Sequence, residues 1–150
     1  VQRAGAGRRV PARVMVYDTR NDLAVLVAPR LVARPLALAD SDEGTSVAIL
    51  GFPGNGRLTA IAGRVGKTAT VVAQDSYGKG PALRLMTSLR GKVDQGSSGG
   101  PAVDVEGRVR STVFGASKVD GTTLGVPASL VKAALARVGR KPVSTGDCAR

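Results

Sequence analysis

Short hydrophobic runs, separated by glycine, proline and polar residues, follow one another along most of the chain. The first two, ARVMVYD at 12–18 and LAVLVA at 23–28, flank the turn composition TRND at 19–22. Alternation in the first run predicts a half-buried strand. The unbroken apolar stretch from Leu23 to Val27 predicts a strand that is buried on both faces.

Six more runs of strand length follow from Ser46 onward, at 46–52, 58–72, 82–89, 101–105, 109–115 and 122–127. Turn residues separate them at short intervals, which is typical of an antiparallel barrel or sandwich rather than of alternating βαβ units. The segment VEGR at 105–108 has the composition of a tight hairpin turn. This pattern predicts an all-β fold.

One helix is predicted after the last strand. Ser129 can cap its N-terminus, and Gly139 can end it. Four residues form the face that would pack on the strands: Leu130, Ala133, Ala134 and Val138. Residues 140–150 have the composition of coil.

Composition narrows the classes of function. Hydrophobic residues make up 43% and charged residues 22%, which indicates a globular chain. The formal charge is +11, but the basic residues are scattered and aromatics are only 3%, so nucleic acid is not predicted as a partner. No apolar run approaches the roughly 20 residues of a membrane helix. Cys148, the only cysteine, is either a free thiol or the partner of a cysteine outside the chain.

The stretch GSSGGP at 96–101 is either a flexible linker or a turn that presents a catalytic serine. Strand-like runs lie close on both sides and Pro101 fixes the backbone, which favours a turn inside a β-domain. A nucleophilic serine needs an exposed hydroxyl beside converging backbone N–H groups, and glycines allow the backbone to take that shape. Ser98 is therefore a candidate nucleophile, although the chain has no histidine to act as its base.

Four motifs in order resemble the chymotrypsin-fold (trypsin-like) serine proteases, in particular their HtrA-related bacterial branch. They are NDLAVL at 21–26, VAILGFPGNGRLTAIAGRV at 47–65, QGSSGGP at 95–101 and LGVPASLV at 124–131. VYD, DLAVL, GFP and the late cysteine resemble the MarP-like branch of actinobacteria, which are membrane-anchored periplasmic acid-resistance proteases. The resemblance covers about Arg13 to Val138.

The resemblance implies a chymotrypsin-like double β-barrel, only part of which is present. Residues 1–30 would be the end of the first barrel, without its N-terminal part, and 31–44 the connector between the barrels. Residues 45–127 would form the complete second barrel with the nucleophile loop. Residues 128–150 would form the C-terminal helix and tail.

The resemblance also assigns the site. Ser98 matches the nucleophile, and the backbone N–H groups of Gly96 and Ser98 match the oxyanion hole. Asp22 matches the buried acid that orients the catalytic imidazole. Asp18 is the alternative, but it ends a strand and lacks the Leu-Ala pattern that follows Asp22.

Substrate contacts follow in the same way. The edge strand that pairs with substrate backbone matches three residues: Phe114, Gly115 and Ala116. Gly125 matches a wall of the primary specificity pocket. The chemistry that the resemblance implies needs no cofactor and no metal ion. Its substrate would be a peptide or a protein.

Two departures from the family pattern stand out. Position 97 is Ser, where related proteases carry Asp or Asn, so an inserted N-terminus would find no carboxylate and Val1 is not interpreted as an activated terminus. The histidine is absent, although the family places it a few tens of residues before the acid. We therefore expect it in a missing N-terminal part, together with the disulfide partner that the resemblance implies for Cys148. A disulfide in turn implies an extracytoplasmic location.

Two functions are weighed. The first is a serine endopeptidase of the periplasm or cell envelope, involved in acid resistance, anchored to the membrane only through the missing part, and nearly inactive as this fragment. The second is a catalytically dead β-barrel that binds peptides or, through its charge of +11, polyanions.

Overall fold

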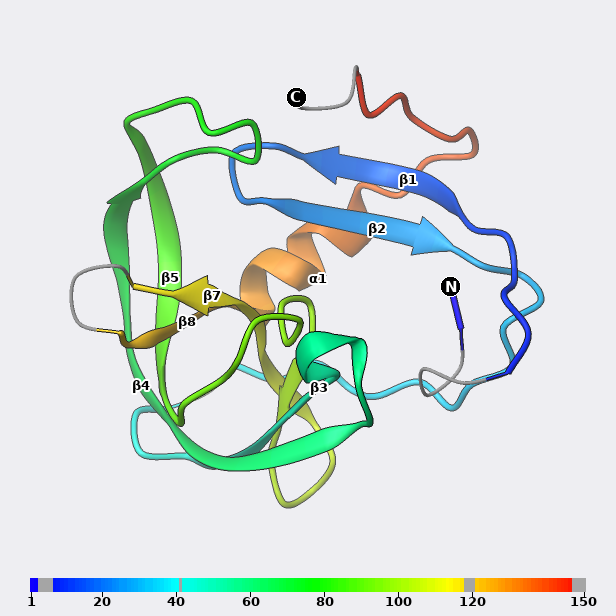
Figure 1. The fold of residues 1–150 in the computed structure, drawn as a ribbon. Coiled ribbons are helices and arrows are strands. Elements are labelled where there is room, and N and C mark those ends of the chain that lie inside the picture. Colours follow the sequence, from blue (N-terminus) through cyan, green and yellow to red (C-terminus); the bar gives the residue numbers. More distant parts are fainter. Residues whose placement is uncertain (3–6, 41, 118–120, 147–150) are drawn as a thin grey trace.

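The computed structural model describes residues 1–2, 7–40, 42–117 and 121–146 (Figure 1). Strands β1 (Arg13–Asp18) and β2 (Leu23–Val27) form a two-stranded antiparallel sheet. The prediction that β2 is buried on both faces is wrong, since Leu26 is 49% exposed and Val27 is 40% exposed. The reason is that β1 covers one edge of β2 and, of the described elements, α1 packs against one face, so the opposite face, which carries Ala24 and Leu26, stays exposed.

Six strands close into a barrel in the order β3-β4-β5-β8-β7-β6, in which every neighbouring pair is antiparallel. Pairing of β3 with β6 closes the circle. A short 3₁₀ helix, η2 (Pro53–Asn55), follows the first of these strands. Their bounds are β3 (Ser46–Gly51), β4 (Thr59–Ala73), β5 (Ala82–Arg90), β6 (Pro101–Val103), β7 (Val109–Ala116) and β8 (Thr123–Pro127).

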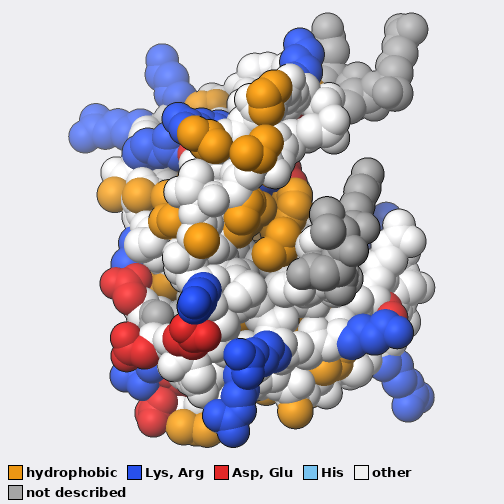
Figure 2. Space-filling model, turned by 90° about the vertical axis from the view of Figure 1, so that its left-hand side faces the viewer, with side chains coloured by type: hydrophobic (Ala, Val, Ile, Leu, Met, Phe, Trp, Pro, Cys, Tyr) orange, Lys and Arg blue, Asp and Glu red, His pale blue; other side chains and the backbone are white. Residues whose placement is uncertain are grey.

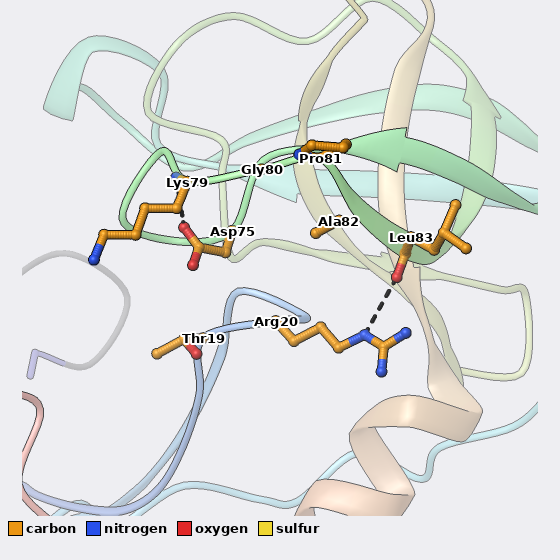
Figure 3. A pocket seen from close by; sticks show the side chains of 8 residues that line it. All are labelled: Thr19, Arg20, Asp75, Lys79, Gly80, Pro81, Ala82 and Leu83. Carbon is orange, nitrogen blue, oxygen red and sulfur yellow. Dashed lines mark hydrogen bonds between the residues drawn. The ribbon is translucent and has the colours of Figure 1, made fainter.

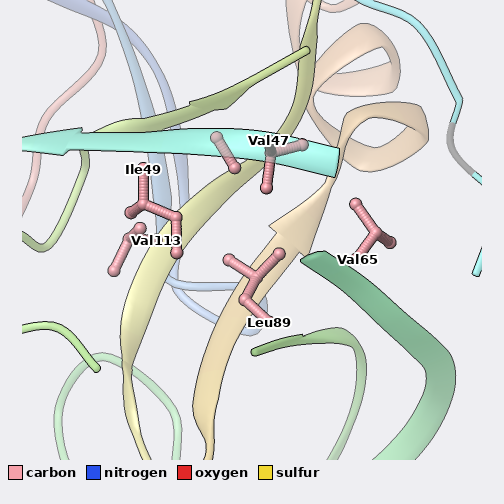
Figure 4. Packing of buried hydrophobic residues seen from close by; sticks show 6 residues of the cluster. Val47, Ile49, Val65, Leu89 and Val113 are labelled. Carbon is pink, nitrogen blue, oxygen red and sulfur yellow. The ribbon is translucent and has the colours of Figure 1, made fainter. Parts of the chain in front are cut away.

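The barrel interior is filled by aliphatic side chains from alternate positions of its strands (Figure 4). Each is at most 6% exposed, so burial of each larger side chain contributes on the order of 1.5–3 kcal/mol. The cluster consists of Val47, Ile49, Val65, Leu89, Ala102 and Val113. The all-β class is therefore confirmed, as is the turn at 105–108, where Gly107 has φ +78°.

The C-terminal helix α1 (Ala128–Ala136) contacts β7 and β8 of the barrel as well as the β1–β2 sheet (Figure 1). The predicted cap is wrong: the helix follows β8 directly, and Pro127, not Ser129, is its N-cap. A proline fits there because its fixed φ suits the change from strand to helix. Its nine residues are too few to cross a bilayer, and no other helix among the described residues could do so.

The packing face of α1 also differs from the prediction. Ala134 is buried and Leu130 is half-buried, but Ala133 is exposed. Val138 lies beyond the end of the helix and is 42% exposed, because the last turn ends at Ala136 and not at Gly139. The buried face is therefore shorter than the sequence pattern predicts.

Candidate active site

Glycines allow the turn at Ser98 to pack against the end of β3. Gly96 has φ +99°, and a Cβ atom there would lie 2.7 Å from the carbonyl oxygen of Phe52. A Cβ atom on Gly100 would collide with the carbonyl oxygen of Leu50. A larger residue at either position would therefore push the turn away from the barrel.

The backbone N–H groups of this turn fall into two sets. Three donate to carbonyl oxygens at 2.7–3.2 Å, those of Ser97, Gly99 and Gly100. The N–H groups of Gly96 and Ser98 have no hydrogen-bond acceptor among the described residues. The two donors that the resemblance assigns to an oxyanion hole are thus the two that the fold leaves available.

The Ser98 side chain is exposed, so a substrate can reach its hydroxyl. The hydroxyl donates a hydrogen bond to the carbonyl oxygen of Phe114 at 3.0 Å. A carbonyl oxygen orients the hydroxyl but does not remove its proton. As described, the site holds an accessible but unactivated serine.

Asp22 lies in the turn between β1 and β2 with φ +52°, a backbone conformation that few residues other than glycine adopt. Its side chain is exposed, not buried as the resemblance implied, and among the described residues the sheet that carries it has only the two strands β1 and β2. Its carboxylate makes no hydrogen bond or ion pair with another described residue. Its oxygen atoms are therefore available to an outside partner.

Asp18 has a different environment. Its carboxylate accepts hydrogen bonds from the backbone and side-chain N–H groups of Asn21, both at 3.0 Å, and pairs with Arg137 at 2.7 Å. Burial alone would raise the pKa of Asp18, but these hydrogen bonds and the Arg137 charge hold that pKa below its ordinary value. The Asp18 carboxylate therefore stabilises the β1–β2 turn through these contacts.

The same turn is held by the loop between β4 and β5. The N–H group of Ser76 donates to the carbonyl oxygen of Thr19 at 3.0 Å, and Nε of Arg20 contacts the carbonyl oxygen of Leu83 at 3.4 Å. Figure 3 shows Arg20 reaching across to Leu83 at the start of β5, and these segments line an open surface pocket of about 520 Å³. None of the predicted site residues lines this pocket, so the pocket is distinct from the site at the serine turn.

The predicted substrate strand lies at the end of β7. Phe114 and Ala116 line a second pocket of about 950 Å³, whose other walls come from β4, β5, β8 and the segments that follow β4 and β7, and are largely apolar. A Cβ atom on Gly115 would meet no atom within 4 Å, so the backbone is open on that side. Figure 2 shows hydrophobic side chains gathered on the side of the molecule where these strands lie.

Other predicted positions have different surroundings. Gly125 is buried in β8 facing Ser111 and lines neither of these two pockets, so its role in a specificity pocket stays a prediction. Ser97 is 2% exposed, and the terminal ammonium of Val1 bonds instead to the carbonyl oxygen of Val10 at 2.9 Å. Cys148 lies outside the described residues.

Sequence reasoning assigned no role to Arg84. This residue is 1% exposed, and its guanidinium contacts both the carbonyl oxygen of Asn21 and the ring of Phe114. The only local signal was a charged residue inside the apolar strand ALRLMTSL. Its partners lie 63 and 30 residues away in the chain, too far for any local pattern to reveal.

Comparison with known proteins identifies the family. Residues 1–110 match the family described as the trypsin-like peptidase domain. The chain belongs to the trypsin-like peptidases. Among its relatives is the serine protease Rv3671c of Mycobacterium tuberculosis (strain H37Rv), 38% identical over 142 residues. The match covers 91% of this trypsin-like peptidase chain and 36% of the relative, so the chain spans about a third of that protein.

Solved structures confirm the chymotrypsin-like fold class of this trypsin-like peptidase. The active form of the Rv3671c protease from M. tuberculosis superimposes with a TM-score of 0.85 at 37% identity, covering 94% of this chain and 64% of the other. The HtrA-type protease AlgW with a decapeptide gives a TM-score of 0.73 at 21% identity, covering 87% and 41%. The second likeness concerns the fold alone.

Proposed function

We propose that this chain supplies the nucleophile and the acid of a serine endopeptidase whose catalytic imidazole lies outside the 150 residues. The observation that carries the proposal is the turn at Ser98. An exposed hydroxyl stands beside two backbone N–H groups, of Gly96 and Ser98, that the fold leaves without acceptors. Membership of the trypsin-like peptidase family supports the same reading.

The proposed reaction is acyl transfer. Oγ of Ser98 attacks the carbonyl carbon of the scissile peptide bond, and its proton passes to the imidazole. The oxyanion is stabilised by the N–H groups of Gly96 and Ser98, and the imidazolium then protonates the leaving amine as the C–N bond breaks. Water attacks the acyl-enzyme in the second half of the cycle and regenerates the Ser98 hydroxyl. Asp22 would orient the imidazole.

The substrate would be a peptide in extended conformation. Its backbone would add to the edge of β7 at Phe114, Gly115 and Ala116, as in other cases of β-strand addition. The apolar pocket beside Phe114 and Ala116 favours a substrate with an apolar side chain near the scissile bond.

We also propose an extracytoplasmic location, in the periplasm or cell envelope, with a role in acid resistance and a membrane anchor outside this chain. The resemblance to the MarP-like branch supports all three. Cys148 would form a disulfide with a cysteine outside the chain, which requires an oxidising compartment. As an isolated chain, the protein would be nearly inactive, because the base is missing.

The test is covalent labelling of the full-length protein with a fluorophosphonate, followed by mass spectrometry of the labelled peptide. We expect label on Ser98, and none in the matched Ser98→Ala variant. A folded full-length protein that is not labelled at Ser98 would refute the proposal. Sequencing upstream of Val1 gives an independent result, since the proposal requires a histidine there.

A second candidate is a catalytically dead binding module. It is favoured by the absence of histidine from the chain and by the contact of the Ser98 hydroxyl with a carbonyl oxygen instead of a base. Such a protein would bind extended peptides along β7 with an affinity that Ser98→Ala leaves unchanged. It would take no fluorophosphonate label, whereas the peptidase would.

A further inference from the structure

Arg84 is the largest side chain that the described chain buries completely, at 1% exposure near the start of β5. A guanidinium keeps its charge in proteins, so burying one is costly unless its N–H groups are hydrogen bonded. Burial lowers the pKa of Arg84, and the negative charges of Asp22, Asp18 and Asp75 act in the opposite direction. Because burial of a charged guanidinium is unfavourable, specific partners must stabilise Arg84.

Those partners come from three separate segments. The guanidinium donates to the carbonyl oxygen of Asn21 in the β1–β2 turn at 2.5 Å and to that of Gln74, just after β4, at 3.1 Å. Its Cζ atom lies 4.2 Å from the centroid of the Phe114 ring in β7, a cation–π distance. Nε is buried without a partner among the described residues. No ion pair forms with a described carboxylate.

Two of these contacts reach the proposed active site. Asn21 directly precedes Asp22 in a turn with unusual backbone angles. Phe114 provides the carbonyl oxygen to which the Ser98 hydroxyl donates. One planar side chain therefore spans the turn of the proposed acid and the strand that orients the proposed nucleophile.

We propose that Arg84 is a positioning residue of the peptidase site. It fixes the position of the turn that carries Asp22 relative to β7, the strand that Ser98 contacts and that we propose binds the substrate. The inference rests on the proposed function, because positioning matters only if Asp22 and Ser98 act together. Arginine suits the role better than lysine, since its fork donates to two carbonyl oxygens while its plane stacks on a ring.

The test uses the full-length protein and the variants Arg84→Met and Arg84→Lys. Arg110→Met is the matched control, because Arg110 is also mostly buried in the barrel but pairs with Asp104, a residue outside the site. Peptidase activity is measured at a temperature where circular dichroism shows all proteins folded. We expect Arg84→Met to lower kcat about 100-fold with KM nearly unchanged, since small misplacements of reacting groups have effects of that size.

The lysine and control variants separate positioning from stability. Arg84→Lys keeps the charge and one hydrogen bond, so we expect kcat to recover to within about tenfold of the wild type. Arg110→Met should change kcat less than about twofold while it lowers the melting temperature. Equal kcat losses in Arg84→Met and Arg110→Met would overturn the proposal.

A second measurement does not depend on catalysis. Relative to the rest of the barrel, amide hydrogen exchange on the 150-residue chain should become faster at residues 19–22 and 113–115 in Arg84→Met but not in Arg110→Met. Unchanged exchange at both segments in Arg84→Met would overturn the proposal. A full-length wild type without peptidase activity would overturn both this proposal and the proposed function. An active wild type with an unimpaired Arg84→Met variant would overturn this proposal alone.

Discussion

The hydroxyl group of Ser98 donates its hydrogen bond to the carbonyl oxygen of Phe114, 3.0 Å away. Phe114 belongs to the strand that we propose pairs with substrate backbone, so the proposed nucleophile and the proposed substrate strand are in direct contact. The contact orients the hydroxyl, but a carbonyl oxygen is too weak a base to activate it. On the proposed function, the reactivity of Ser98 would therefore depend on a base from outside this chain.

The first prediction concerns the reaction of Ser98 with a fluorophosphonate. The 150-residue chain should react at least about 1,000-fold more slowly than the full-length protein, because loss of one triad member removes most of the rate enhancement. Labelling is followed by mass spectrometry over time, with Ser98→Ala as the blank for both proteins. A difference of less than tenfold would show that no outside base is needed.

The second prediction distinguishes the two aspartates. In the full-length protein, Asp22→Asn should lower kcat by about 10⁴-fold, as expected for the acid that orients an imidazole. The free energy of unfolding should fall by no more than about 1 kcal/mol, because the Asp22 carboxylate makes no hydrogen bond or ion pair with a described residue, although its charge acts favourably on Arg84, and because asparagine tolerates its backbone angles.

Asp18→Asn is the matched variant, and its effects should be reversed. It weakens the hydrogen bonds to Asn21 and the ion pair with Arg137, so we expect a loss of about 1–2 kcal/mol in stability. Its kcat should stay within about tenfold of the wild type. Urea denaturation and steady-state kinetics measure the two quantities, and a larger kcat loss in Asp18→Asn would make Asp18 the acid.

The third prediction concerns the backbone at the oxyanion site. Gly96→Ala should lower kcat at least about 100-fold, because the new Cβ atom would press on the carbonyl oxygen of Phe52 and displace a donor N–H group. Gly107→Ala is the control, with φ +78° but no atom within 4 Å of the new Cβ. It should lose about 1–2 kcal/mol of stability and keep its activity. Similar kcat values for the two variants would contradict the assignment of Gly96.

The fourth prediction concerns stability in acid. The Asp104 carboxylate, at 2% exposure, accepts hydrogen bonds from Arg108 and Arg110. Burial alone would raise the pKa of Asp104, but these hydrogen bonds and the Arg108 charge outweigh it and hold the pKa well below its ordinary value. A carboxylate with a lowered folded-state pKa stabilises the fold above the unfolded-state pKa, and this stabilisation is lost as the pH falls toward the folded-state value.

Asp104→Asn makes this contribution measurable. The stability difference between the wild type and Asp104→Asn should be constant from about pH 5 to 7 and shrink from about pH 4 to 2, since the unfolded aspartate titrates near 3.9. Urea denaturation of the 150-residue chain at a series of pH values gives the difference directly. A difference that grows as the pH falls through this range would contradict the sign of the shift.

The elements that the sequence predicts well are those whose signals are local. Alternating aliphatic residues and glycine-rich turns define β3, β4 and β5 to within about one or two residues of the observed bounds. Burial of β2 and the start of α1 could not be predicted in this way. The first depends on whether other strands cover the sheet, and the second on Pro127 ending β8 where the helix begins.

In the candidate site, too, the features with a local sequence signal could be predicted and those that depend on distant residues could not. The turn at Ser98 is visible in the sequence because its shape requires glycines at neighbouring positions. Arg84 is not, because the role that we propose for it depends on contacts with Asn21, Gln74 and Phe114, which come together only when the β1–β2 turn packs on the barrel. The exposure of Asp22 likewise depends on what lies over the turn.

The pairing of β3 with β6 closes the barrel without using β1 or β2. The segment that carries Ser98 joins β5 to β6, two strands of that barrel, so its shape depends on contacts within the barrel. If the proposed function holds, this chain is suited to a split enzyme, in which a separately produced segment that carries the histidine would restore activity. This chain and the segment with the histidine could each be fused to one of two interacting proteins. Proteolysis would then report the interaction, and the residual activity of this chain alone would be the background signal.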